Sequence, residues 1–119
     1  MINIEAYREY CLKKKGVTEG FPFDENVLVF KVMNKMFALT DINEFEYINL
    51  KCDPERAILL REEFSGILPG YHMSKNNWNS VYTNSDVAPK LVYELIDHSY
   101  NMVVKSLPKK IQKELEEME

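Results

Sequence analysis

The sequence predicts a two-layer α+β fold, in which an antiparallel sheet carries its helices on one face. Near both ends of the chain, apolar residues recur at the spacing of a helix. Between these ends lie shorter runs, and in several of them apolar and polar residues alternate as in a strand. Short polar turns join most of these runs, so neighbouring strands are expected to be antiparallel. The predicted order along the chain is α-β-β-β-α-β-β-α.

The composition indicates a single folded domain. A chain of 119 residues can bury a core of its own without disulfides. Hydrophobic residues make up 45% of it and charged residues 29%, as in ordinary globular domains. The formal net charge is −4, whereas a protein that coats DNA is basic. Any contact with DNA is therefore expected to be local and weak.

Neither targeting nor cofactor motifs are evident in the sequence. Residues 1–15 are charged and lack the apolar stretch of a signal peptide, and no apolar run is long enough to span a membrane. We expect a cytoplasmic protein without a membrane partner. Cys11 and Cys52 match no metal-binding spacing and are expected to be reduced thiols in the core. No glycine-rich phosphate loop exists, and neither a cofactor nor a metal is predicted.

The first helix is predicted to begin after Asn3, whose side chain suits an N-cap. Tyr7 and Cys11 fall on one apolar stripe. Lys13–Lys15 are expected in the last turn, where the helix dipole favours cations, and Gly16 is expected to terminate the helix.

A hairpin is predicted next, with strands over 27–33 and 36–40 and a turn at Asn34 and Lys35. In this register five apolar residues share one buried face. They are Leu28, Phe30, Val32, Phe37 and Leu39.

A third strand is predicted over 46–52, where Ile48, Leu50 and Cys52 alternate with polar or aromatic positions. Asp53 and Pro54 then predict the start of a second helix that reaches about Phe64. Its apolar stripe is Ala57, Leu60 and Phe64.

The second half weakly echoes the first, since in each half a helix is followed by strands. Residues 67–73 are interpreted as an irregular or edge strand and 78–83 as another strand. Asp86 is a candidate N-cap for the third helix, with Pro89 in its first turn. Ser99 lies in that helix's apolar stripe, where a small residue permits close approach to the sheet. Residues 1–107 are taken as one domain and 108–119 as a charged C-terminal tail that could be helical.

Five segments of the chain carry a family resemblance. They are Phe21-Pro-Phe-Asp24, Lys35-Met-Phe-Ala38, Asn49-Leu-Lys-Cys-Asp-Pro-Glu55, Pro69-Gly-Tyr-His-Met-Ser-Lys75 with Trp78, and Leu95-Ile-Asp-His-Ser-Tyr100. Together they resemble the MmcQ/YjbR family of small bacterial proteins over about residues 1–107. The resemblance implies a CyaY-like, "double wing" α+β fold and a DNA-binding role.

The most informative stretch for function is 68–78, within a run from 65 to 85 that contains no Asp or Glu. Hydrogen-bonding and stacking groups without carboxylates suit an anionic or aromatic ligand. In the alternative interpretation, the tryptophan fills the core, the histidine bonds to the backbone and the lysine lies in a turn. The candidate ligand-binding residues are Tyr71, His72, Lys75 and Trp78.

Two binding functions follow from these observations. The first is a non-enzymatic module that binds DNA through the strands around Lys75 and Trp78. The second is a protein-interaction or chaperone-like adaptor that uses the exposed face of the sheet, which the acidic net charge favours. No catalytic residue is predicted: Asp97, His98 and Ser99 are neighbours on a helix and should point in different directions.

Overall fold

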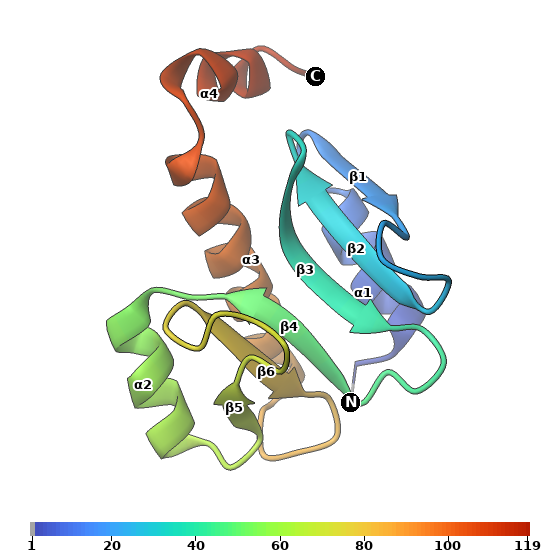
Figure 1. Ribbon diagram of the computed structural model, residues 1–119, viewed down its shortest axis with the longest axis vertical. Helices are drawn as coiled ribbons and strands as arrows, with labels where there is room; N and C mark the ends of the chain where they lie inside the picture. Colours follow the sequence, from blue (N-terminus) through green and yellow to red (C-terminus); the bar gives the residue numbers. More distant parts are fainter. Residues whose placement is uncertain (1) are drawn as a thin grey trace.

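The computed structural model describes residues 2–119 of the chain. Its elements are α1 (Ile4–Leu12), β1 (Val17–Gly20), β2 (Val27–Val32), β3 (Lys35–Asp41), β4 (Tyr47–Lys51), α2 (Pro54–Glu63), β5 (Ile67–Pro69), β6 (Trp78–Tyr82), α3 (Pro89–Ser106) and α4 (Lys109–Glu116). All six strands form one antiparallel sheet in the order β1-β2-β3-β4-β6-β5. Helices α1 and α3 lie behind the sheet, whose other face is towards the viewer (Figure 1).

The predicted α+β class is confirmed, but the predicted order omitted β1. This strand has only four residues, and its middle two, Thr18 and Glu19, are exposed, so it shows no apolar alternation. The tail contains a further helix, α4, whose Leu115 is buried. Lys13–Lys15 were wrongly placed in the last turn of α1, because that helix ends at Leu12 and the lysines form the turn before β1.

The main core lies between the helices and one face of the sheet. Phe30 and Ile48 from the sheet, with Tyr7 from α1 and Ile96 from α3, are completely buried in it. The rings of Tyr7 and Phe30 meet edge to face, with centroids 5.4 Å apart. Burying each large apolar side chain contributes about 1.5–3 kcal/mol, so this layer supplies most of the stability.

The turn between β2 and β3 lies one residue earlier than predicted. Met33 and Asn34 occupy it with φ of 47° and 71°, and Val32 pairs with Lys35. Two consecutive positive φ values are the signature of the type I′ hairpin turn, whose twist matches that of the strands. The prediction had assumed that Asn34 opens the turn, whereas it is the second of the two turn residues.

A β-bulge at Phe37 then changes the face on which β3 residues lie. Phe30 pairs with Ala38 and Lys31 with Met36, so Phe37 has no partner of its own. Phe37 stays in the main core as predicted, but Leu39 lies on the opposite face, beside Val29 and Trp78. The prediction that Leu39 faces the helices was therefore wrong.

Strands β3 and β4 pair from Thr40 and Ile48 to Ala38 and Leu50, and beyond that point they separate (Figure 1). The next pair in this register would be Phe37 and Lys51. Instead, the hydroxyl of Ser99 lies between them: it donates to the Phe37 carbonyl at 2.5 Å and accepts from the Lys51 amide at 2.8 Å. A single buried hydroxyl thus satisfies two backbone groups where the sheet divides.

The side chains of the three successive residues 97–99 have separate partners, as predicted. Asp97 contacts α1, Ser99 contacts the sheet, and the His98 Nε2 accepts from the Asp53 amide at 3.0 Å at the start of α2. Asp53 is the N-cap of α2 and accepts from the Arg56 amide. These three residues do not form a triad.

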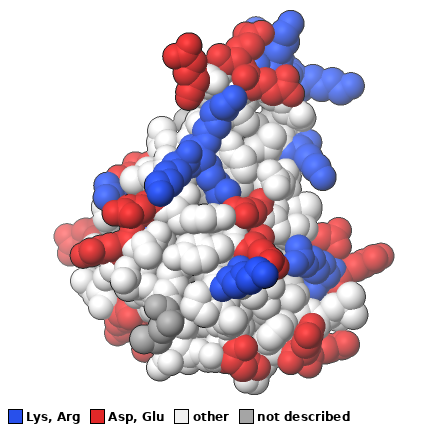
Figure 2. All heavy atoms as spheres, turned by 180° about the vertical axis from the view of Figure 1, so that it is seen from behind, with Lys and Arg blue, Asp and Glu red and all other residues white. Residues whose placement is uncertain are grey.

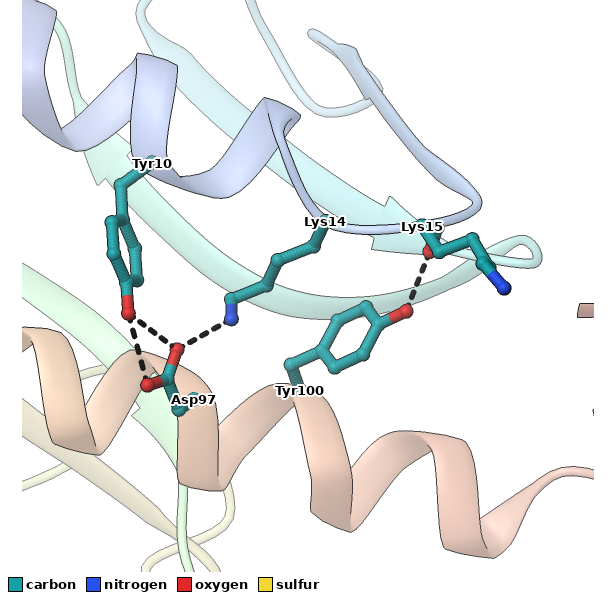
Figure 3. Close-up of polar contacts among 5 residues, drawn as sticks. All are labelled: Tyr10, Lys14, Lys15, Asp97 and Tyr100. Carbon is teal, nitrogen blue, oxygen red and sulfur yellow. Dashed lines mark hydrogen bonds and ion pairs between the residues drawn. The ribbon is translucent and has the colours of Figure 1, made fainter. Parts of the chain in front are cut away.

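Asp97 anchors the end of α1 to α3 (Figure 3). Its carboxylate accepts from the Tyr10 hydroxyl at 2.8 Å and forms an ion pair with Lys14, and the Tyr100 hydroxyl donates to the Lys15 carbonyl at 2.6 Å. Burial and the bond to Asp97 raise the pKa of Tyr10 to about 12, which keeps this donor neutral.

Asp86 does not cap α3, contrary to prediction. Helix α3 begins after Ala88, without a side-chain cap. The Asp86 carboxylate instead accepts from the Ser65 and Gly66 amides at 2.9 and 2.8 Å, which lowers its pKa. It therefore fixes the connection between α2 and β5.

No helix among residues 2–119 is both long and apolar enough to cross a bilayer. Within the same residues, no three His, Cys, Asp or Glu side chains converge as metal ligands would.

We expect the Ser99→Ala variant to lose about 1–3 kcal/mol of unfolding free energy, because the Lys51 amide and Phe37 carbonyl would lose their buried partner. Urea unfolding measures this loss. Ser106→Ala is the matched control on the same helix, where an exposed hydroxyl bonds only to the Val103 carbonyl. Equal losses in the two variants would contradict the proposed role of Ser99.

We also expect His98 to make stability fall in acid. Burial, followed by the nearby charge of Arg56, lowers the pKa of His98 below its usual value of 6.5. At pH values between the pKa of His98 in the unfolded chain and its lower pKa in the folded chain, the unfolded chain binds a proton more readily. The unfolding free energy should therefore decrease as pH falls from about 6.5. Urea unfolding of the wild type and of His98→Gln at pH 5 to 8 tests this. If the unfolding free energy of the variant depended on pH as steeply as that of the wild type, the prediction would be refuted.

Candidate functional site

The face of the sheet opposite α1 and α3 is crossed by residues 70–77, which we call the strap (Figure 1, the yellow loop between β5 and β6). The strap begins as a continuation of the β5–β6 pairing, because the Gly70 amide donates to the Trp78 carbonyl at 2.8 Å. A Cβ at Gly70 would lie 2.7 Å from the Trp78 Cβ, so only glycine fits this close approach.

Arg61 of α2 holds the base of the strap. Its Nε donates to the Asn79 side-chain oxygen at 2.6 Å, and its Nη2 donates to the Lys75 and Trp78 carbonyls. The Cys52 amide adds a bond to the Asn77 carbonyl at 2.8 Å. The exit of the strap is thereby fixed to both α2 and β4.

A buried polar network fixes the other end of the strap. The Ser80 hydroxyl donates to the Asn49 side-chain oxygen at 2.5 Å and accepts from the Tyr71 amide at 2.9 Å. The Asn49 Nδ2 donates to the Tyr71 carbonyl at 3.2 Å. The main chain of Tyr71 is therefore held in place, while its side chain remains 58% exposed.

An open pocket of about 530 Å³ lies between the strap and the loop 21–26. Its apolar lining comes from two strands and the strap: Val27, Met36, Leu39 and Met73. Three aromatic side chains, Phe23, Tyr47 and Tyr71, complete it. The rings of Tyr47 and Tyr71 are nearly perpendicular, at 85°, with centroids 6.1 Å apart. Phe23 is 63% exposed, so this pocket presents apolar surface to solvent.

Few charges line this pocket. Asp41 is the one acid among its lining residues, and no Lys or Arg is among them. The Asp41 Oδ1 accepts from the Asn43 and Glu44 amides at 2.8 and 3.2 Å. Burial is the largest cause that raises the pKa of Tyr47, so its hydroxyl stays protonated near neutral pH. The site can thus surround an apolar group and offer a single carboxylate.

The four predicted site residues lie in different surroundings. Tyr71 and His72 line the pocket, with ring centroids 4.0 Å apart, and His72 has a φ of 60°. Lys75 is exposed on the strap and forms no ion pair with any residue from 2 to 119. Trp78 is only 8% exposed and packs with Val29 and Leu39. Its ring fills a small second core beneath the strap. The functional interpretation required this ring to be open to a ligand, and it is not.

Sequence reasoning missed the part that residues outside the strap play in the pocket, among them Phe23, Asp41, Tyr47 and Asn49. One signal was available. Because Ile48 and Leu50 were predicted to face the core, Tyr47 and Asn49 had to share the opposite face. An aromatic and an amide on the same outer face were thus a readable sign that this face differs from a surface of charged side chains.

The family model described as YjbR matches residues 12–102. The chain belongs to the YjbR family. All residues that line the pocket fall within the matched range. The chain is 38% identical to the uncharacterised protein YbdF of Escherichia coli O157:H7, over 92% of this chain and 90% of that protein. It is 30% identical to the uncharacterised protein YjbR of Escherichia coli K12, over 94% and 96%.

Solved structures of similar proteins share this architecture. The crystal structure of protein DR2400 from Deinococcus radiodurans is 39% identical, with a TM-score of 0.89 over 97% of this chain and 88% of that one. A crystal structure of a protein from Pseudomonas syringae is 28% identical, with a TM-score of 0.72 over 85% of this chain and 98% of that one.

We expect Asn49→Ala to loosen the strap and to lower the unfolding free energy by about 1–3 kcal/mol, because buried partners at Ser80 and Tyr71 lose their bonds. Amide hydrogen exchange should become faster at Tyr71. Asn76→Ala, at an exposed strap position, is the control and should change neither quantity. Unchanged protection of Tyr71 in Asn49→Ala would show that the network does not hold the strap.

Proposed function

We propose that this YjbR-family protein is a non-enzymatic binding module whose ligand enters the pocket between the strap and the loop 21–26. One observation carries the proposal: a largely apolar pocket of about 530 Å³ is already formed, and hydrogen bonds from Asn49 and Ser80 hold the main chain of Tyr71 in its wall. Pockets of roughly 300–1,000 Å³ with an apolar lining and a few polar groups are typical of ligand sites.

The exposed apolar groups around the pocket support binding through the sheet face. Phe23 and Tyr71, which both line the pocket, are each more than half exposed. Aromatic groups are enriched where proteins bind partners, since they bury a large area at a small cost in side-chain entropy. The second function predicted from the sequence, an adaptor that uses the exposed sheet face, agrees better with this lining than a phosphate-binding surface does.

DNA binding remains a prediction with narrower support. The acid-free run and the exposed Lys75 favour it, whereas burial of Trp78 removes the stacking group. On the face that carries α1 and α3, acidic and basic side chains are interspersed (Figure 2). Few phosphates would be neutralised, so binding should be weak, with a salt dependence of about −0.9 per phosphate contacted.

We expect indole, a neutral aromatic probe, to bind in the pocket with a dissociation constant on the order of millimolar, as is usual for so small a ligand. In ¹H–¹⁵N NMR titrations the shifts should concentrate at Leu39, Tyr71 and Met73. The Tyr71→Ala variant should show smaller shifts on addition of indole, whereas the control variant Asn76→Ala should show the same shifts as the wild type. Scattered shifts, or none, would overturn the proposed function.

If DNA is bound through the strap, Lys75→Ala should abolish the change in fluorescence anisotropy of a labelled duplex at low salt. Lys90→Ala, at an exposed position at the start of α3, is the charge-matched control. Binding that survives Lys75→Ala, or equal losses in both variants, would exclude the strap as the DNA site.

A further inference from the structure

We infer that the ligand is a small quaternary ammonium compound, whose methylated cationic head lies against Phe23, Tyr47 and Tyr71 and faces Asp41. This inference rests on the proposed function and specifies the chemistry of the same pocket.

The aromatic lining supplies rings to which such a head is attracted. A cation is attracted to the face of an aromatic ring, and several rings set at large angles can contact one rounded cation together. Tyr47 and Tyr71 stand at 85° to each other, and Phe23 lines the pocket from a different loop. The backbone bonds at Tyr71 hold one of these walls in place before any ligand arrives.

The charge around the pocket selects a cation. Asp41 is the charged lining residue, and among residues 2–119 no group is found to donate a hydrogen bond to its Oδ2. The loop that supplies Phe23 carries the exposed Asp24 and Glu25, and the loop that follows Asp41 at the end of β3 carries the exposed Glu44. No Lys or Arg lines the pocket and His72 is its one basic side chain, so the acids around it favour a cationic head over an anionic one.

The protein already holds an ammonium group in this manner elsewhere. Lys14 Nζ lies 4.9 Å from the centre of the Tyr10 ring and 5.2 Å from that of Tyr100, and it pairs with the Asp97 carboxylate (Figure 3). The pocket repeats the combination of tyrosine rings and one carboxylate. No lysine of the chain occupies the pocket as Lys14 occupies the other cluster, and the cationic head of a ligand would take that position.

The apolar lining favours a methylated head over a primary ammonium. A primary ammonium brings three N–H donors that need acceptors, and burying them unpaired is costly. Quaternary nitrogen has no N–H, and its methyl groups suit the side chains of Leu39, Met36 and Met73. The pocket volume, about 530 Å³, is in the range of small-molecule sites, so we assign a free metabolite-sized compound.

The test compares choline with 3,3-dimethyl-1-butanol, a neutral compound in which carbon replaces the charged nitrogen. In NMR titrations of the full chain, choline should bind about tenfold more tightly than the alcohol. Asp41→Asn keeps the acceptor for the Asn43 amide and should remove that preference. Tyr71→Phe should retain it. Glu55→Gln removes an exposed acid on α2, and as the control for general negative charge it should change little.

Each other outcome has a defined meaning. Equal binding of the two compounds, or indole binding without choline binding, would overturn the ammonium inference and leave the proposed function intact. Failure of indole, choline and the alcohol together would overturn both. Much tighter binding of a trimethyl-lysine peptide than of choline would replace the assigned metabolite with a modified protein segment.

Discussion

The structure depends on one buried hydroxyl at the point where the sheet divides. Ser99 takes the place of a direct bond between Phe37 and Lys51, so β3 can leave β4 without stranding either backbone group. The adjacent bulge keeps the Phe37 ring in the main core and turns Leu39 to the other face. The apolar floor of the pocket is a consequence of this local irregularity, since a regular hairpin would have placed Leu39 under the helices.

The strap gives the open face a small core and a rigid edge. Trp78 is sealed beneath it with Val29 and Leu39, while Asn49 and Ser80 bond to the main chain of Tyr71. A fully satisfied buried polar network favours one arrangement of the chain over its alternatives. The ring of Tyr71 is therefore exposed but preorganised, which reduces the entropy that a ligand must overcome on binding.

Two parts of the molecule combine tyrosine rings with a carboxylate, and they serve different ends. At α1 and α3 the combination is completed by Lys14 from the same chain and joins two helices. At the sheet face Asp41 and Tyr47 have no such partner among the lining residues. The same electrostatic attraction between a cation and a ring thus stabilises the fold in one place and suits ligand recognition in the other.

Local patterns in the sequence determined the class of fold, the N-caps at Asn3 and Asp53 and the core side of β4, because each depends on a few neighbouring residues. They also drew attention to Tyr71 and His72 of the strap, which line the pocket. Tertiary structure alone decided the bulge at Phe37, the burial of Trp78 and the meeting of Phe23, Asp41, Tyr47 and Tyr71 in one pocket. These features depend on contacts between segments far apart in the chain, and no spacing of residues encodes them.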